Sequence, residues 1–329
     1  MMSSESSSTP AAAAAILSEA ARVLIVTHEN PDGDGIGSAL ALRHALRARG
    51  KEVHCCLTDP CPEKYAFLPG AEVFTTAAPE TEPDCAVALD CDGSARLGRL
   101  LPAFERAPVT CSIDHHNGLQ RFATVNWVDP RRPATALMVY ELLRLLCAEI
   151  DADIATCLYT GVAADTGFFR FQNTTPEALA VAGELVGLGA DPSGIARRSA
   201  EAVPLRKALL TGRALASLGQ YVEGRVLVGV LDLEDFVATE ARPEDTDGIV
   251  DQLKQVAGPQ IVILIRESEP RRWRVSMRSQ EADVSSVCRR FGGGGHALAA
   301  GCSLEGPASE VVEQLVDAAA AALSPGGAL

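Results

Sequence analysis

Residues 23–38 read VLIVTHENPDGDGIGS, which is an apolar run, a polar glycine-rich turn and the start of a helix. The run Val23–Thr27 predicts a buried strand. The Ala- and Leu-rich stretch from about Ile36 to Arg49, closed by Gly50, predicts the helix. A strand that is apolar throughout and leads directly into a helix is typical of a parallel sheet covered on both faces.

The same pattern of apolar runs and helical segments continues toward residue 195. Three further runs predict strands, at Val53–Leu57, Cys85–Leu89 and Val109–Ile113. Helices are expected over residues 134–149, 151–162 and 175–188. The fold class is therefore α/β, with an N-terminal domain built on a parallel sheet that has helices on both faces.

The character of the chain changes near residue 195. A helix is expected over residues 204–218, followed by strands over 225–231, 260–266 and 272–278. We predict a disordered tail over residues 1–15, a first domain over 16–195, a linker helix within 196–222 and a smaller α/β domain over 223–329.

Composition limits the possible functions. The 329 residues carry a formal net charge of −14, which argues against binding long duplex nucleic acid through the backbone. The chain begins without the features of a signal peptide and has no apolar run of about 18 residues, so we expect a cytoplasmic protein that does not bind membranes. None of the ten cysteines forms a C-x-x-C pair, and we interpret them as small apolar residues.

The turn after the first strand contains three candidate metal ligands. His28, Asp32 and Asp34 lie within a few residues, where Pro31 and the glycines let the backbone fold tightly. Imidazole and carboxylate together suit Mn²⁺, Fe²⁺, Co²⁺ or Zn²⁺. An ordinary turn with a helix cap explains the same residues equally well.

Three more polar sites follow apolar segments. Asp90 leaves the third strand, Asp114-His115-His116 leaves the fourth, and Asp165 lies near a helix end with Arg170 beyond it as a candidate phosphate contact. Loop histidines and a surface cap are the plainer explanations. Because ligands bind beyond the carboxyl ends of parallel strands, we expect one site, and this ligand set suits two adjacent cations that catalyse phosphoryl transfer.

The C-terminal part contains the glycine-rich run FGGGGHALAAG at residues 291–301. Consecutive glycines let a ligand approach the backbone, although a flexible hairpin is the alternative. No Gly-Lys-Ser/Thr follows, so the run is not a Walker loop. From Arg266 to Arg290 the chain has seven arginines and four acidic residues, which favours substrate binding by this domain.

Taken together, these motifs resemble those of the DHH phosphoesterase family over about residues 20–305. HENPDGDGIGS resembles the first motif of that family, Asp90 the second, Asp114-His115-His116 the third and ADTG, which contains Asp165, the fourth. SMRS and GGGGHALAAG resemble its associated C-terminal domain. The sequence FRFQNTTP is most similar to the branch of bifunctional oligoribonucleases and pAp phosphatases, pAp being 3′-phosphoadenosine 5′-phosphate.

The resemblance implies a role for each motif residue. One Mn²⁺ takes His28, Asp32 and Asp90, and the other takes Asp34, Asp90, His115 and Asp165, with Asp90 bridging. Asp114 lies behind the metal ligands and does not bind a cation itself. His116 contacts the phosphate or helps to protonate the leaving group. The implied substrate-binding residues of the C-terminal domain are Arg278, Ser279, Gly293, Gly294, Gly295 and His296.

The implied substrates are short oligoribonucleotides and pAp, and a homodimer is possible. The alternative is a phosphodiesterase acting on cyclic or linear dinucleotides such as pApA. A pyrophosphatase is disfavoured because no basic SRKK-type run is present, and a regulator without activity is disfavoured because all six metal-ligand positions are kept.

Overall fold

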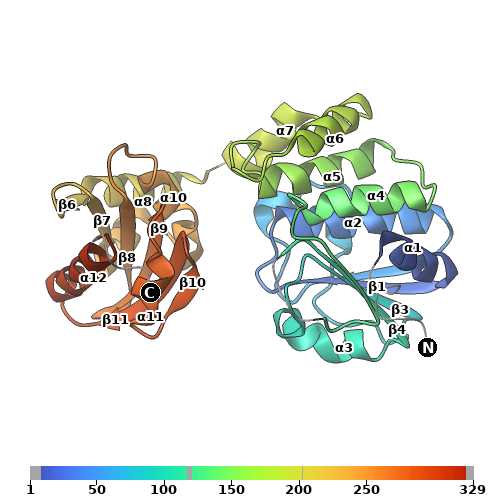
Figure 1. Ribbon diagram of the computed structural model, residues 1–329, viewed down its shortest axis with the longest axis horizontal. Coiled ribbons are helices and arrows are strands. Elements are labelled where there is room, and N and C mark those ends of the chain that lie inside the picture. Colours follow the sequence, from blue (N-terminus) through green and yellow to red (C-terminus); the bar gives the residue numbers. More distant parts are fainter. Residues whose placement is uncertain (1–8, 117–120, 202, 324–329) are drawn as a thin grey trace. The chain divides into compact units, whose positions relative to one another are not determined.

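The computed structural model describes residues 9–116, 121–201 and 203–323. The chain forms two compact units that divide at residues 202–203, and each unit is built around one sheet (Figure 1). Among the described residues, no helix combines the length and the apolar character needed to cross a bilayer.

The first unit contains a five-stranded parallel sheet, which confirms the predicted fold class. Its strands are β1 (Arg22–Thr27), β2 (Glu52–Cys56), β3 (Cys85–Leu89), β4 (Val109–Asp114) and β5 (Val125–Val128). The order is β2-β1-β3-β4-β5, and every neighbouring pair is parallel. The chain therefore reverses its direction of winding between β1 and β3, where open α/β sheets bind ligands.

Helices cover both faces of this sheet (Figure 1). One face packs against α1 (Pro10–Glu19), α2 (Gly33–Ala48), α4 (Thr135–Leu145) and α5 (Ala152–Asp165). Outside α5 lie α6 (Pro176–Gly187) and α7 (Pro192–Ala196). The opposite face packs against η3 (Ser94–Leu100) and α3 (Leu101–Glu105). Alternate residues of β1 supply the two cores, since Ile25 faces the first and Leu24 the second.

The N-terminal segment differs from the expected tail over residues 1–15. Helix α1 begins at Pro10, Thr9 caps it by accepting a hydrogen bond from the Ala12 N–H, and Leu17 is fully buried in the core. The alanine run thus forms a helix because it has an N-cap, a proline in its first turn and an apolar face to bury. Residues 1–8 of the expected tail lie outside the described residues.

The second unit contains a mixed six-stranded sheet. Its strands are β6 (Gly219–Tyr221), β7 (Val226–Leu231), β8 (Ile261–Glu269), β9 (Arg272–Ser279), β10 (Gly294–His296) and β11 (Ala299–Glu305). The order is β10-β11-β9-β8-β7-β6, and only β7 and β8 are parallel among these pairs. The glycine-rich run enters the sheet as the β10–β11 hairpin, the structure that the plainer explanation of this run expected.

Helices also cover both faces of the second sheet. One face packs against α8 (Leu205–Ala216), α9 (Leu233–Thr239) and α10 (Ile249–Leu253). The other packs against α11 (Val284–Arg289) and α12 (Ala308–Ala322). Leu210 and Ala214 of α8 are fully buried in this core, so α8 is an integral part of the second unit, whereas the sequence placed it in a linker over 196–222.

Candidate metal and active site

The carboxyl ends of β1, β3 and β4 meet at the β1/β3 switch point and bring distant motifs together. His28 follows β1, Asp90 follows β3 and His115 follows β4. The first turn of α2 supplies Asp34, and the last residue of α5 is Asp165. Three sets of potential ligand atoms form here, each within 4.8 Å: His28, Asp32 and Asp90; Asp34, His115 and Asp165; and Asp90, His115 and His116.

Asp90 lies at the centre of the site. Its Oδ2 is 3.7 Å from His28 Nε2, and its Oδ1 is 3.5 Å from His115 Nε2. The residue is only 1% exposed, and its φ of 60° lies in the left-handed region that most residues avoid. The backbone thus adopts an uncommon conformation at the residue whose two carboxylate oxygens face different histidines.

His28 directs Nε2 at two carboxylates. Its Nδ1 faces away from the carboxylates and lies 2.7 Å from the Glu29 carbonyl oxygen. Nε2 points toward Asp90 and toward Asp32 Oδ1, which is 3.8 Å away, so it can bind a cation once it is deprotonated. Arg96 lies beside this ring, with Nη2 2.8 Å from Nδ1 and 3.4 Å from the Glu29 carbonyl oxygen.

His115 has the same arrangement. Its Nδ1 lies 3.2 Å from the Arg132 carbonyl oxygen, so Nε2 has the lone pair. This Nε2 is 3.3 Å from Asp165 Oδ2 and 3.9 Å from Asp34 Oδ2. The atom is buried and has no hydrogen-bond partner among the described residues. A buried nitrogen that faces carboxylates and has no hydrogen-bond partner is suited to bind a cation.

Asp34 is fully buried and caps another helix. Its carboxylate accepts hydrogen bonds from the backbone N–H groups of Thr135 at 2.6 Å and Ala136 at 2.8 Å, and from the Ser38 hydroxyl at 3.3 Å. These N–H groups belong to the first turn of α4, whose own N-cap residue, Ala134, has no capping side chain. The helix N-terminus therefore fixes the orientation of the Asp34 carboxylate.

Thr135 also contacts Asp90, through a 3.0 Å hydrogen bond from its hydroxyl to Oδ1. Thr135 was not predicted from the sequence, because nothing in the local pattern connects the first turn of α4 with the end of β3.

Both interpretations of the first motif, a helix cap and a candidate metal ligand, apply to Asp32. Its Oδ1 caps α2 by accepting from the N–H groups of Asp34 and Gly35, while it also faces His28.

The crowding of carboxylates in this site favours a bound cation. Burial and the nearby Asp90 carboxylate raise the pKa of Asp165 to about 6. Burial raises the pKa of Asp34 as well. Although burial opposes the charged form of His28, the carboxylates of Asp32 and Asp90 raise its pKa to about 10. Clustered carboxylates, two imidazoles and an unpartnered buried nitrogen fit divalent metal ions.

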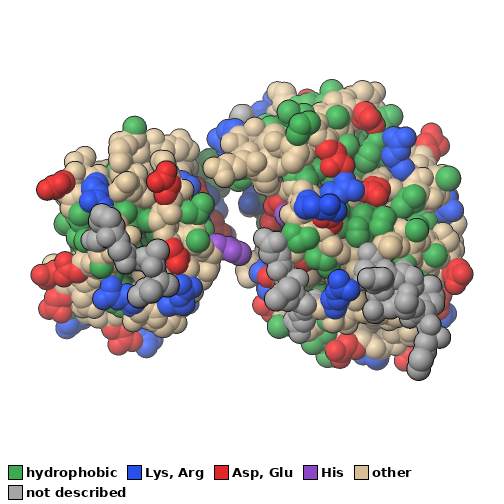
Figure 2. Space-filling view, in the orientation of Figure 1, with side chains coloured by type: hydrophobic (Ala, Val, Ile, Leu, Met, Phe, Trp, Pro, Cys, Tyr) green, Lys and Arg blue, Asp and Glu red, His purple; other side chains and the backbone are tan. Residues whose placement is uncertain are grey.

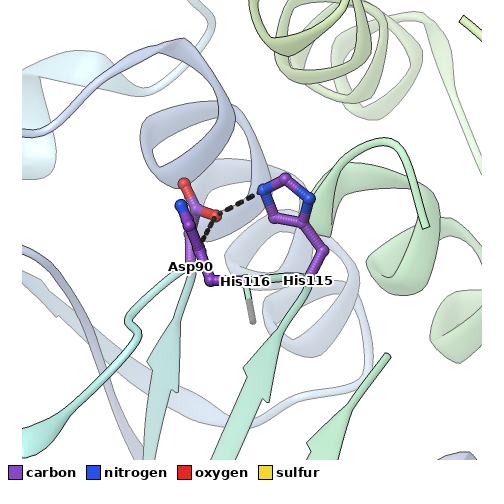
Figure 3. Close-up of side chains that lie close together, drawn as sticks. All are labelled: Asp90, His115 and His116. Carbon is purple, nitrogen blue, oxygen red and sulfur yellow. Dashed lines mark ion pairs between the residues drawn. The ribbon is translucent and has the colours of Figure 1, made fainter. Parts of the chain in front are cut away.

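Asp114 and His116 form a pair beside the ligands. Asp114 is buried, and its Oδ1 accepts a 2.8 Å hydrogen bond from His116 Nδ1 and a 3.2 Å bond from the His116 backbone N–H. The hydrogen bond that His116 donates to the Asp114 carboxylate raises the pKa of His116 to about 9. Figure 3 shows His115 and His116 at the end of β4 with both rings beside the Asp90 carboxylate. The His116 side chain is 41% exposed, so it is accessible to a substrate.

The predicted substrate-binding residues belong to both units, with Arg170 in the first and the others in the second. Arg170 is exposed, and its Nε donates to the Gly167 carbonyl. In the second unit, Arg278 Nε donates to Asp251 Oδ1 at 2.7 Å, and the Ser279 hydroxyl donates to the Ala282 carbonyl. His296 is exposed at the end of β10.

Two of the three glycines at 293–295 have structural reasons in the β10–β11 hairpin. A side chain at Gly293 would clash with the Gly301 carbonyl, and Gly295 has a φ of 139°, which favours glycine. Gly294 pairs with Gly301 and has open space at its Cα. Because the hairpin itself explains these glycines, ligand binding by the hairpin stays a proposal.

Comparisons with known proteins identify the family. The DHH family N-terminal domain matches residues 22–162, and the DHHA1 domain matches residues 223–324. A protein of Thermus thermophilus named bifunctional oligoribonuclease and PAP phosphatase NrnA is 36% identical over 311 residues, which cover 93% of this chain and 92% of that relative. The chain belongs to the DHH family. The prediction of a DHH-family hydrolase is confirmed.

Solved structures agree with this fold. An exopolyphosphatase-related protein from Bacteroides fragilis is 24% identical, with a TM-score of 0.86 over 92% of this DHH-family chain and 93% of its own. RecJ from Thermus thermophilus, solved in complex with Mn²⁺, is 18% identical, with a TM-score of 0.57 over 96% of this chain and 55% of its own. The sequence placed the metal-binding motifs at the strand ends where this fold gathers its candidate ligands.

Proposed function

We propose that this DHH-family phosphoesterase uses two divalent cations to hydrolyse short oligoribonucleotides and pAp, and that the native cation is Mn²⁺. One observation carries the proposal. The Asp90 carboxylate lies between His28 Nε2 and His115 Nε2, with one oxygen facing each nitrogen. A carboxylate with this placement suits a bridge between two cations.

The ligand sets divide into two groups around Asp90. His28, Asp32 and Asp90 would hold one cation, and Asp34, Asp90, His115 and Asp165 would hold the other. When bound, such a pair of cations lowers the pKa of water and stabilises charge on the phosphoryl oxygens. Backbone carbonyls that fix each imidazole through Nδ1 support this assignment, because metal-binding histidines are commonly oriented in this way.

His116 and Asp114 are the proposed acid–base pair. The Asp114 carboxylate accepts from His116 Nδ1, which orients the ring and keeps it protonated at neutral pH. A protonated Nε2 on a partly exposed ring suits proton donation to the leaving oxygen of a phosphoester. Because the third potential ligand set also contains His116, its role as an acid rather than a ligand is part of the proposal.

The second unit is proposed to bind the substrate through Arg278, Ser279 and the Gly293–His296 hairpin. The Arg278 guanidinium has the planar fork that binds phosphate in two places, and in this structure Asp251 occupies it. A substrate phosphate would exchange with that carboxylate. Arg170 in the first unit is proposed as a further phosphate contact.

The acidic character of the protein supports small substrates over long duplexes. The net charge is −14. On the face of each unit in Figure 2, acidic side chains are interspersed with basic ones, and the described residues there form no broad basic area. The name of the Thermus thermophilus relative, an oligoribonuclease and PAP phosphatase, supports the same substrate class. We also propose a cytoplasmic location and leave a homodimer as a possibility.

A substrate panel tests the proposal against the dinucleotide alternative. Purified chain with Mn²⁺ is incubated with pAp, a 5′-phosphorylated trinucleotide, pApA and cyclic di-AMP, and the products are separated by chromatography. Turnover of pAp and the trinucleotide is the expected result. Preference for pApA or cyclic di-AMP would favour the alternative, and no turnover of any nucleotide would overturn the proposal.

A further inference from the structure

A second cluster of charge lies on the second sheet, centred on side chains that have been given no individual role above. The register pairs Arg266 of β8 with Arg274 of β9, and Arg274 with Ser303 of β11. The next row pairs Ser276 with Gly301. Residues paired in this way point to the same face, so three adjacent strands place two arginines and two serines together.

These side chains surround a pocket of about 440 Å³. Ser276 and Gly301 belong to its lining, together with Phe291, Gly292 and Gly293 from the chain before β10. Gly301 has no side chain to fill the space above its strand, and a Cβ there would meet only the Val275 carbonyl oxygen, at 3.0 Å. The pocket is therefore hollow because of the residue type at its centre.

Neither arginine of this pocket forms an ion pair with a carboxylate of the described residues, although Asp247 lies near enough to favour the charged form of Arg266. Arg274 makes no hydrogen bond or ion pair with any described residue, and Arg266 donates only to the Pro243 carbonyl oxygen at 3.4 Å. The other two arginines of β9 differ in this respect, since Arg272 pairs with Glu269 and Glu305, and Arg278 pairs with Asp251. Like charges directly opposite in a sheet are unfavourable unless an anion lies between them.

We propose that this pocket, defined by Arg266, Arg274, Ser276 and Ser303, binds a phosphate group of a nucleotide. Two guanidinium groups supply charge and paired donors, and the serine hydroxyls supply further donors. The choice of a nucleotide phosphate over other anions rests on the proposed function. The phosphate comes either from the backbone of an oligonucleotide or from a free mononucleotide.

Binding to the full-length chain tests the site without catalysis. In EDTA, a fluorescent 5′-phosphorylated pentanucleotide and unlabelled AMP are titrated against wild type, Arg266→Ala, Arg274→Ala and the control Arg290→Ala. Arg290 is exposed in the same unit and does not line the pocket. We expect Kd to rise about tenfold or more in the two pocket variants and to change less than twofold in the control. The slope of log K against log salt should fall by about one for each pocket arginine removed.

A charge reversal separates binding from folding. Arg274→Glu places a carboxylate opposite Arg266 and replaces a repulsive pair with an attractive one. We expect its Tm to equal or exceed that of wild type while anion binding is lost. Unchanged Kd values in all three pocket variants would overturn the proposal.

Kinetics then distinguish the two sources of phosphate. If the oligonucleotide occupies the pocket, Arg274→Ala raises KM for the pentanucleotide and leaves KM for pAp unchanged. If a mononucleotide occupies it, AMP binding is lost and both KM values stay the same. Absence of hydrolysis by wild type would overturn the proposed function. The binding experiment would still test the pocket, because it does not depend on catalysis.

Discussion

The Asp34 carboxylate accepts a 2.6 Å hydrogen bond from the backbone N–H of Thr135, which lies 101 positions further along the chain. The Thr135 hydroxyl in turn donates to Asp90 Oδ1 at 3.0 Å. One residue at the start of α4 therefore orients two of the proposed metal ligands. The spacing between the two sites depends on this residue as well as on the ligands themselves.

Thr135→Val removes the hydroxyl and keeps the size of the side chain. We expect Mn²⁺ affinity or kcat to fall by about 10–100-fold, because partners that orient ligands typically have effects of this size. Isothermal titration with Mn²⁺ and steady-state kinetics measure the two quantities. Thr211→Val is the matched control, since its buried hydroxyl donates only to the Lys207 carbonyl of its own helix. Equal affinities in the two variants would contradict the positioning role.

Asp90→Asn tests the bridge more cleanly than an alanine variant. Asparagine tolerates the left-handed backbone at this position, so the change removes charge without adding strain. We expect no measurable hydrolysis and no stabilisation by Mn²⁺. The Tm of the metal-free protein should rise, because one of several clustered carboxylates is gone. Asp92→Asn, at an exposed neighbouring residue, should keep both activity and metal-dependent stabilisation. Near-normal turnover in Asp90→Asn would contradict the bridge.

Gly161 in α5 leaves room for the Asp34 carboxylate, a proposed metal ligand. A Cβ there would lie 2.9 Å from Asp34 Oδ1 and 2.6 Å from Ala136 Cβ. Gly161→Ala should therefore cost about 1–3 kcal/mol in free energy of unfolding and weaken Mn²⁺ binding. Gly183→Ala in α6 is the control, because a Cβ there meets nothing within 4 Å, and it should stabilise the protein by about 0.5–1 kcal/mol. Denaturant unfolding measures the free energy of unfolding of both variants, and metal titration measures their Mn²⁺ affinity. Equal changes in the two variants would refute the steric role of Gly161.

Metal binding should release protons. In the metal-free protein His28 has a pKa of about 10, so at pH 7 it carries a proton that must leave when Nε2 binds a cation. Asp165, with a pKa of about 6, adds a second proton as the pH falls below that value. Affinity for Mn²⁺ therefore decreases with falling pH. At pH 7 we expect at least one proton released per chain, because burial raises the pKa of the Asp34 carboxyl as well, and titration calorimetry in buffers of different ionisation enthalpy measures the number. His28→Gln should lower this number by about one, and His54→Gln should leave it unchanged.

The sequence predicted the ligand cluster because each ligand follows a recognisable segment. Apolar runs such as Cys85–Leu89 reveal buried strands, and parallel strands end at one edge. The motifs at those ends therefore converge whatever the details of packing. The same reasoning does not predict the roles of Thr135 and Arg96, because their contacts depend on how α4 and η3 pack against the sheet.

Strand β5 and helix α1 of the first unit were also not predicted from the sequence, for physical reasons. Strand β5 (Val125–Val128) is a short edge strand interrupted by Asn126, so its apolar pattern is weak. Helix α1 begins in a run of alanines that resembles a low-complexity tail, and burial of Leu17 against the first core stabilises it. Both elements form because of tertiary packing, which the local sequence pattern does not show.

Arg278→Ala tests substrate binding by the second unit. The side chain is paired with Asp251, at 2.7 Å from Nε to Oδ1 and 3.4 Å from Nη2 to Oδ2. If Arg278 binds a substrate phosphate, its loss raises KM for pAp by about tenfold or more and changes kcat little. Asp251→Asn removes the competing carboxylate and keeps the arginine, so it should leave KM unchanged or lower it. A role limited to the ion pair predicts that both variants lose stability equally and that neither changes KM, and that result would assign Arg278 to the fold.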